Sequence, residues 1–138
     1  MRSLVLLAAL TATLSHAAWN GYTEDRNLEL PAAGIRVLEI DAGAGTLAVT
    51  GADNATDIRV LATIKVDDSD DDAKKMIESD LRLALEKKRD KAILRSYFDH
   101  GMWNRGGNAS IDLQVEIPRG LELMIDDGSG SVLSLIHI

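Results

Sequence analysis

Cysteine is absent from the 138-residue chain, and aromatic residues make up only 4% of it. Without cysteine there is no disulfide framework and no lipid-anchor thiol, so the fold must rely on its hydrophobic core. Basic residues are also in the minority, because 15 Lys and Arg stand against 22 Asp and Glu, for a formal net charge of -7. This balance disfavours nucleic acid and anionic membranes as partners, since binding to phosphates depends mainly on Lys and Arg.

The chain also lacks an apolar run of about 20 residues, the length that a membrane-spanning helix needs. Its longest apolar run, residues 4–14, follows Arg2 and precedes the small residues Ala17 and Ala18. A basic start, a short apolar core and a small-residue border are typical of a secretory signal peptide. We therefore predict that residues 1–17 are a leader and that the protein is exported to the periplasm, the cell surface or the medium. A buried N-terminal helix is the alternative.

The remainder fits one domain, because single domains cluster at roughly 100 to 150 residues. Its hydrophobic pattern has a period of two, which favours short β-strands with one buried face. The clearest alternations lie in residues 58–66 and 110–118. Further strands are expected at 35–40, 46–50 and 121–125, with Gly-rich turns between them.

One helix and one hairpin interrupt this pattern. Acidic residues and a serine at 67–72 precede a short helix expected at about 71–79, where they would cap its free N–H groups. Residues 81–98 favour a hairpin, because alternate leucines precede a polar break and a second β-rich run. Continuation of the helix through residue 88 is the alternative. Residues 19–31 show no clear period and are interpreted as a polar lead-in, and residues 99–108 as a loop.

An internal repeat is the most informative feature. The sequence Ile-Asp-Ala-Gly-Ala-Gly-Thr-Leu at 40–47 matches Ile-Asp-Asp-Gly-Ser-Gly-Ser-Val at 125–132 without a gap. The offset is 126 minus 41, or 85 residues. A proline, a glycine and a short strand precede each copy. Strand, Gly-rich turn and strand therefore form a unit, which is compatible with a β-solenoid or with a sandwich.

This repeat, with Leu-Gln-Val-Glu-Ile-Pro-Arg-Gly-Leu at 113–121 before its second copy, resembles a family of exported bacterial adhesin-type proteins. They carry β-strand repeats and include the autotransporter-head-like type. The resemblance covers about residues 32–132 and implies a β-helix-like stack of short strands with more repeats after residue 125. It implies no functional residue, because the family has no agreed biochemical activity.

The candidate sites are weak. The acidic run 67–72 has oxygen ligands for calcium but lacks the glycine and the closing glutamate of an EF-hand loop, so we interpret it as a helix cap. Ser96, Asp99 and His100 are the residue types of a hydrolase triad without a nucleophile elbow. Two glycosylation patterns begin at Asn54 and Asn108. An aromatic patch that could contact a glycan or a protein, and whose alternative role is packing, comprises Tyr97, Phe98, Met102 and Trp103.

The sequence therefore predicts a mainly β, non-enzymatic exported protein with a role in adhesion or in cell-envelope interaction. No catalytic residue, metal or cofactor is assigned, and the expected partners are an envelope protein or a glycan. The alternative is a carbohydrate-active enzyme that uses outward carboxylates such as Asp112, Glu116 and Glu122. Residues 18–132 are taken as one β-repeat domain truncated at its C-terminus, and the apolar residues 133–138 as a tail that is not native to it.

Overall fold

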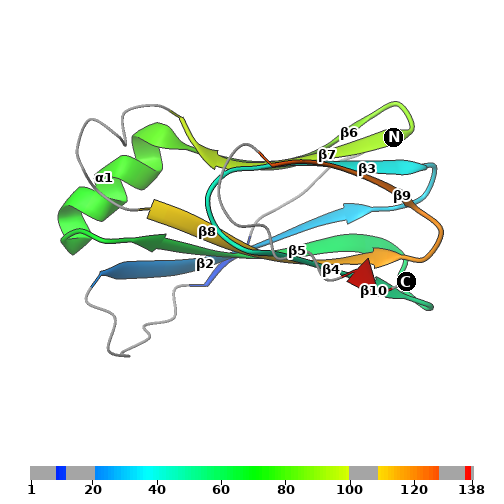
Figure 1. Cartoon of the computed structure of the whole chain (residues 1–138), viewed down its shortest axis with the longest axis horizontal. Helices are drawn as coiled ribbons and strands as arrows, with labels where there is room; N and C mark the ends of the chain where they lie inside the picture. Colours follow the sequence, from blue (N-terminus) through cyan, green and yellow to red (C-terminus); the bar gives the residue numbers. More distant parts are fainter. Residues whose placement is uncertain (1–8, 12–20, 100–108, 128–135, 138) are drawn as a thin grey trace.

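Two facing β-sheets form the described part of the chain, which in this computed structural model comprises residues 9–11, 21–99, 109–127 and 136–137 (Figure 1). One sheet has the strand order β1-β2-β5-β8-β4-β10 and the other β6-β7-β3-β9. The strands are β1 (Ala9–Thr11), β2 (Tyr22–Pro31), β3 (Val37–Ala42), β4 (Leu47–Ala52), β5 (Asp57–Val66), β6 (Leu81–Lys88), β7 (Lys91–Phe98), β8 (Ala109–Pro118), β9 (Glu122–Asp127) and β10 (Ile136–His137). The expectation of a mainly β fold is thus confirmed.

The core lies between the two sheets and follows the period-two pattern. On β5 and β8 every second residue is buried, including Ile58, Ile64 and Leu113. Leu38 and Leu94 enter the same cluster from the opposite sheet. A fully buried aliphatic side chain of this size contributes about 1.5–3 kcal/mol relative to an exposed one, so this layer supplies the cohesion that disulfides cannot.

The helix α1 (Asp70–Asp80) lies at one end of the two layers (Figure 1). Ser69 is its N-cap, and the hydroxyl accepts a hydrogen bond from the backbone N–H of Asp72 at 3.4 Å. The helix buries Ala73, Met76 and Ile77 against the core. It ends at residue 80 and β6 follows at once, so the hairpin β6–β7 is confirmed and the longer helix is wrong.

One part of the chain differs from expectation. Residues 22–31, expected to be a polar lead-in, form β2 and pair along their whole length with β5. Their inward positions carry Tyr22, Glu24 and Arg26 before Leu28, and these polar side chains hide the alternation. In addition, Ala9–Thr11, inside the predicted leader, pair with β2 at Asp25–Asn27 as β1.

The parallel pairs define three arches, each a strand in one sheet followed by a strand in the other: β7–β8, β3–β4 and β9–β10. Strand β3 lies parallel between β7 and β9, and β4 lies parallel between β8 and β10. The remaining pairings, β1–β2, β2–β5, β5–β8 and β6–β7, are antiparallel. Both sheets are therefore mixed, and the described strands do not form a uniform solenoid.

The repeat coincides with this stacking. Ile40 pairs with Ile125 and Asp41 with Asp126 in the β3–β9 register, which is the 85-residue offset of the sequence repeat. Two equivalent strands thus lie side by side with equivalent residues in the same row. The Gly–x–Gly turn and the strand start of the second copy, residues 128–132, lie outside the described residues.

Candidate functional site

The acidic run of residues 67–72 serves the helix. Asp70, Asp71 and Asp72 occupy its first turn, where their charge complements the helix dipole. The side chain of Asp68 accepts a hydrogen bond from the backbone N–H of Ser69 at 2.9 Å. Over the described residues, no group of three or more His, Asp or Glu side chains is placed to hold a metal ion.

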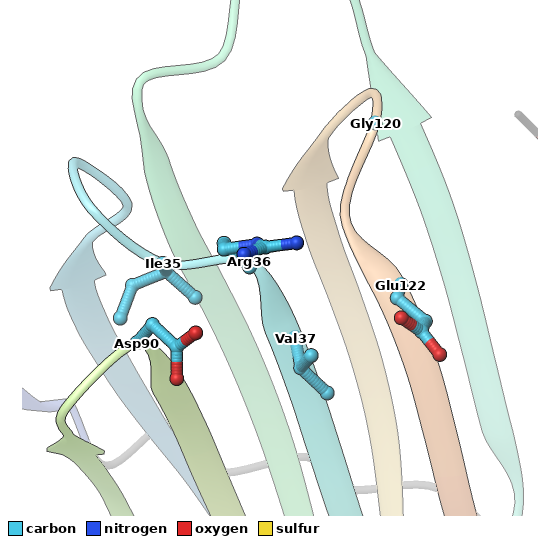
Figure 2. Close-up of a pocket in the computed structure, with 6 residues that line it drawn as sticks. All are labelled: Ile35, Arg36, Val37, Asp90, Gly120 and Glu122. Carbon is cyan, nitrogen blue, oxygen red and sulfur yellow. The ribbon is translucent and has the colours of Figure 1, made fainter.

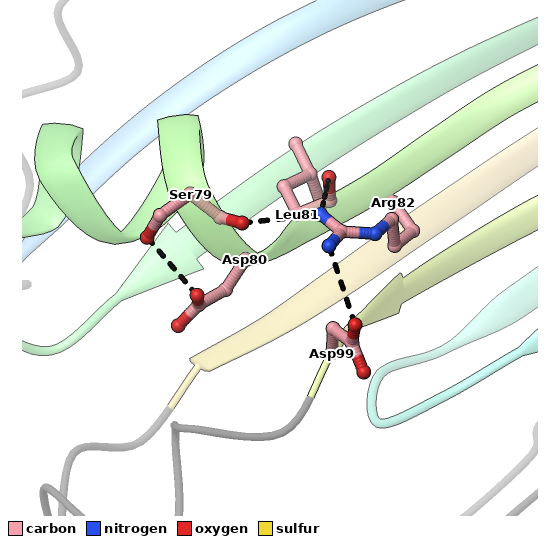
Figure 3. Close-up of polar contacts among 5 residues, drawn as sticks. All are labelled: Ser79, Asp80, Leu81, Arg82 and Asp99. Atoms are coloured by element: carbon pink, nitrogen blue, oxygen red, sulfur yellow. Dashed lines mark hydrogen bonds and ion pairs between the residues drawn. The ribbon is translucent and has the colours of Figure 1, made fainter.

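Of the hypothetical triad the structure describes Ser96 and Asp99, which are not hydrogen-bonded to each other. Ser96 is 1% exposed on the inner face of β7, and its hydroxyl has no hydrogen-bond partner among the described atoms. Asp99 instead faces Arg82, whose Nη2 lies 3.2 Å from Oδ2 of Asp99 (Figure 3). Arg82 Nη1 also donates to the carbonyl oxygens of Ser79 and Leu81 at 3.1 and 3.2 Å. Asp99 thus joins the end of β7 to the α1–β6 junction, and His100 lies outside the described residues.

The outward carboxylates named for a carbohydrate-active enzyme do not converge. Asp112 and Glu116 lie on β8 in the six-stranded sheet, whereas Glu122 lies on β9 in the other sheet. Glycosidases need two carboxyl groups within about 5–9.5 Å across one bond. Glu122 belongs to the other layer, and Asp112 and Glu116, four residues apart on one strand, are separated by about 13 Å along it. Asp112 is in addition committed to two structural contacts: Lys65 Nζ at 2.9 Å and the backbone N–H of Thr46 at 3.0 Å.

These contacts also set the titration of Asp112. Partial burial opposes its ionisation, but the hydrogen bonds from Lys65 and Thr46 together outweigh burial and hold its pKa below the ordinary 3.8. The carboxylate is thus charged under all but strongly acidic conditions. Its position opposite Thr46 ties β8 to the start of β4, so this residue fastens the turn of the β3–β4 arch.

A buried polar cluster on β2 was not predicted from the sequence. Glu24 is 8% exposed, and it accepts a hydrogen bond from the Tyr22 hydroxyl at 2.9 Å and an ion pair from Arg26 Nε at 2.7 Å. Burial and the bond to Glu24 raise the pKa of Tyr22 to about 12. The spacing i, i+2, i+4 of the three residues was the available signal, since it places them on one face of a strand.

A groove of about 450 Å³ lies at the base of the parallel strands. Its lining residues come from three segments: Ile35, Arg36, Val37, Asp90, Gly120 and Glu122 (Figure 2). The backbone there is bonded internally, with Arg36 N–H donating to the Asp90 carbonyl at 2.7 Å and Glu122 N–H to the Arg36 carbonyl at 3.0 Å. The groove combines the guanidinium of Arg36 with the carboxylates of Asp90 and Glu122, and none of its lining residues is a serine, threonine, lysine or histidine.

Gly45 of the first repeat copy, and one glycine before each copy, have structural roles. Gly45 has φ +133°, and a Cβ there would lie 2.0 Å from the carbonyl oxygen of Ile111. The β3–β4 and β7–β8 arches therefore contact each other through backbone atoms at Gly45 and Ile111. Gly34 and Gly120, which precede the two copies, both have positive φ, as turn residues should.

The structure describes three of the remaining candidates. Asn54 is exposed in the β4–β5 turn, and Tyr97 and Phe98 are half-buried on β7. Asn108, Met102 and Trp103 lie outside the described residues. No helix in the described segments is both long and apolar enough to cross a membrane.

Comparisons with known proteins give no identity. A scan against protein-family models, a search of curated proteins and a search of solved structures find no match to this chain. The adhesin-type resemblance therefore rests only on the repeat and on residues 113–121.

Proposed function

We propose that this chain is a non-enzymatic, exported β-repeat protein that acts in adhesion or in cell-envelope interaction. The in-register pairing of the two repeat copies on β3 and β9 carries this proposal. The Asp and Gly residues that stand out in the sequence have a structural explanation, because they build turns and rows of a stacked scaffold. Asp112 likewise has a structural role, because it accepts a hydrogen bond from Thr46 at the start of β4 and forms an ion pair with Lys65 on β5.

For the finer fold, we propose a sandwich of two mixed sheets in which three parallel arches lie side by side. The arches β7–β8, β3–β4 and β9–β10 follow one another along one axis, and β5, β2 and β6 close one end by antiparallel pairing. Stacked repeats need such a cap, because an uncovered terminal strand templates pairing with other chains. The stack thus continues into antiparallel strands on the β2 and β6 side.

An activity screen tests the non-enzymatic assignment. The purified chain is incubated with a panel of acidic and neutral polysaccharides, and new reducing ends and unsaturated products are measured. We expect no turnover. Turnover that disappears in Asp112→Asn, Glu116→Gln or Glu122→Gln would overturn the proposal and establish the carbohydrate-active alternative.

Export is tested separately. Expressed with its leader in a bacterium, the protein should be recovered from the periplasm or the medium, cleaved after Ala17 or Ala18. Mass spectrometry of the exported chain decides this, since retention of Met1 would contradict a cleaved leader.

A further inference from the structure

Basic side chains gather at the turn of the β6–β7 hairpin. Four of the five residues 87–91 are Lys or Arg, in a chain whose formal net charge is -7. Lys87, Lys88 and Arg89 are exposed, and within the part of the chain that the structure describes no carboxylate forms an ion pair with them. Lys91, by contrast, pairs with Glu39 at 3.2 Å. The turn is therefore a small cationic surface on an acidic protein.

The charge of the molecule is segregated between its two ends. Five of the six residues 67–72 are aspartates, and they lead into α1. This helix lies at the end of the two layers opposite the β6–β7 turn (Figure 1). A partner with negative groups is thus repelled by one end of the sandwich and attracted to the other.

The backbone of the turn holds Arg89 in an unusual conformation. Lys88 pairs with Lys91, so Arg89 and Asp90 form a two-residue turn, in which Arg89 has φ +63°. Glycine, asparagine or aspartate is the usual residue at such a position, and Arg89 is the only residue other than glycine with positive φ in the described segments. The Asp90 carbonyl accepts a hydrogen bond from the Arg36 N–H at 2.7 Å, which fixes the turn to the start of β3. A charged side chain held in a strained and anchored backbone is typical of binding sites.

The groove of about 450 Å³ adjoins this turn, because Asp90 lines it. Figure 2 shows the Arg36 side chain between the carboxylates of Asp90 and Glu122, and Ile35 and Val37 line the groove with apolar side chains. A bare anion would be repelled by the two carboxylates, whereas hydroxyl groups donate hydrogen bonds to carboxylates and accept them from a guanidinium. The groove therefore suits a ligand that carries hydroxyl groups beside its charge.

We infer that the β6–β7 turn and this groove bind an acidic polysaccharide, with its anionic groups at Lys87, Lys88 and Arg89 and an adjoining sugar ring in the groove. This inference rests on the proposed interaction role and names its partner class.

Two other anionic partners fit less well. An anionic membrane presents an extended charged surface, which would also face the acidic residues that dominate this chain, whereas a single polysaccharide strand contacts the basic turn alone. An acidic peptide depends on buried apolar anchors for most of its binding energy, and the exposed side chains at 87–90 are all charged.

The experiment uses the full 138-residue chain and a fluorescently labelled oligosaccharide of galacturonic acid, with binding measured by anisotropy. The matched control ligand is the methyl ester of the same oligosaccharide, which keeps the sugar backbone and loses the charge. We expect the acid form to bind about tenfold more tightly, because several exposed ionic contacts each add a modest attraction. The preference should shrink at about 1 M salt, where the Debye length is about 3 Å. Inorganic phosphate should displace the oligosaccharide no more than chloride does at the same ionic strength.

Two matched double variants place the charged part of the site. Lys88→Gln with Arg89→Asn removes two cations from the turn, and Lys74→Gln with Lys75→Gln removes two exposed cations from α1. The first should weaken binding of the acid form about fivefold, and the second should change it by less than about twofold. Arg89→Asn alone should leave the urea midpoint unchanged or raise it, because asparagine adopts positive φ more readily than arginine. Loss of binding is thereby separated from loss of folding.

Glu122→Ala tests the groove. Removal of this negative charge would strengthen binding of a bare anion, whereas loss of a hydrogen-bond acceptor should weaken binding of the oligosaccharide about threefold. Tighter binding by Glu122→Ala would overturn the inference in favour of a simple anion site.

Equal binding of the acid and ester forms, or an equal loss in the two double variants, would also overturn the inference. Displacement by phosphate beyond that by chloride would overturn it in favour of a simple anion site. Tighter binding to phosphatidylglycerol vesicles, or to a peptide of alternating glutamate and leucine, would overturn it in favour of a membrane or of a protein. Release of unsaturated products or new reducing ends from the oligosaccharide would instead refute the proposed non-enzymatic function while leaving the binding preference as measured.

Discussion

Replacement of Gly45 by alanine tests how closely the arches are packed. In Gly45→Ala the new Cβ would lie 2.0 Å from the oxygen, 2.6 Å from the carbon and 2.9 Å from the nitrogen of Ile111. All three are backbone atoms, so no side chain can rotate away. The β3–β4 and β7–β8 arches must separate, and the flanking hydrogen bonds Ile111 N–H to Ala44 O at 3.0 Å and Leu113 N–H to Thr46 O at 2.8 Å must lengthen.

The expected loss in free energy of unfolding has two sources. Placing a Cβ in a positive-φ conformation costs about 1–2 kcal/mol. Weakening one or two backbone hydrogen bonds adds about 0.5–1.5 kcal/mol each. The sum, about 1.5–5 kcal/mol, is a large fraction of the roughly 5–15 kcal/mol that stabilises a typical domain.

Gly120→Ala is the matched control, because Gly120 has φ +96° and a Cβ added there would meet no atom within 4 Å. It should lose only the conformational part, about 1–2 kcal/mol. Urea denaturation followed by far-UV circular dichroism gives both values. Equal destabilisation by the two substitutions would refute the close approach of the arches at Gly45.

Three further substitutions probe single contacts. Asp112→Asn should lower the free energy of unfolding by about 0.5–1 kcal/mol at pH 7. Because the folded pKa of Asp112 lies below 3.8, the wild-type stabilisation is present above pH 3.8 and is lost as the pH falls through the folded pKa. The two proteins should therefore converge in stability in acid, and a difference that stays constant with pH would contradict this. Ser69→Ala should cost about 0.5–1 kcal/mol by removing the N-cap, whereas Ser69→Asp should retain most of it; equal urea midpoints for Ser69→Ala and wild type would argue against the cap. Ser96→Ala should be neutral or stabilising by up to about 1 kcal/mol, because it removes a buried hydroxyl without a partner among the described atoms, and a clear loss in thermal melts would contradict that.

The sequence predicted those elements whose side-chain pattern follows from burial on one face. β5 and β8 alternate apolar and polar residues along their length, and Ser69 with the aspartates marks the start of α1. β2 was missed because Glu24 and Arg26 occupy inward positions, where paired charges replace hydrophobic side chains. Local period carries no information on such tertiary pairing.

Local sequence patterns also did not predict the direction of the strands or which strands pair with each other. The repeat signalled that residues 40–47 and 125–132 are equivalent, but only the structure places β3 between β7 and β9 in parallel. For the candidate site, residue types alone suggested a triad at Ser96 and Asp99 and a carboxylate pair on the strands. The fold places these groups in separate environments, and Arg82 and Lys65 hold two of the acids in structural ion pairs.

Disulfide trapping measures the in-register stacking of the repeat most directly, because the chain has no cysteine of its own. Asp41 and Asp126 are partners in neighbouring strands, within reach of a disulfide, whose Cα atoms lie about 4.4–6.8 Å apart. The double variant Asp41→Cys with Asp126→Cys should oxidise to an intramolecular disulfide. Asp41→Cys with Glu122→Cys, four residues out of register, should stay reduced. Cross-linking of the second pair and not of the first would contradict the parallel, in-register arrangement of the two repeat copies.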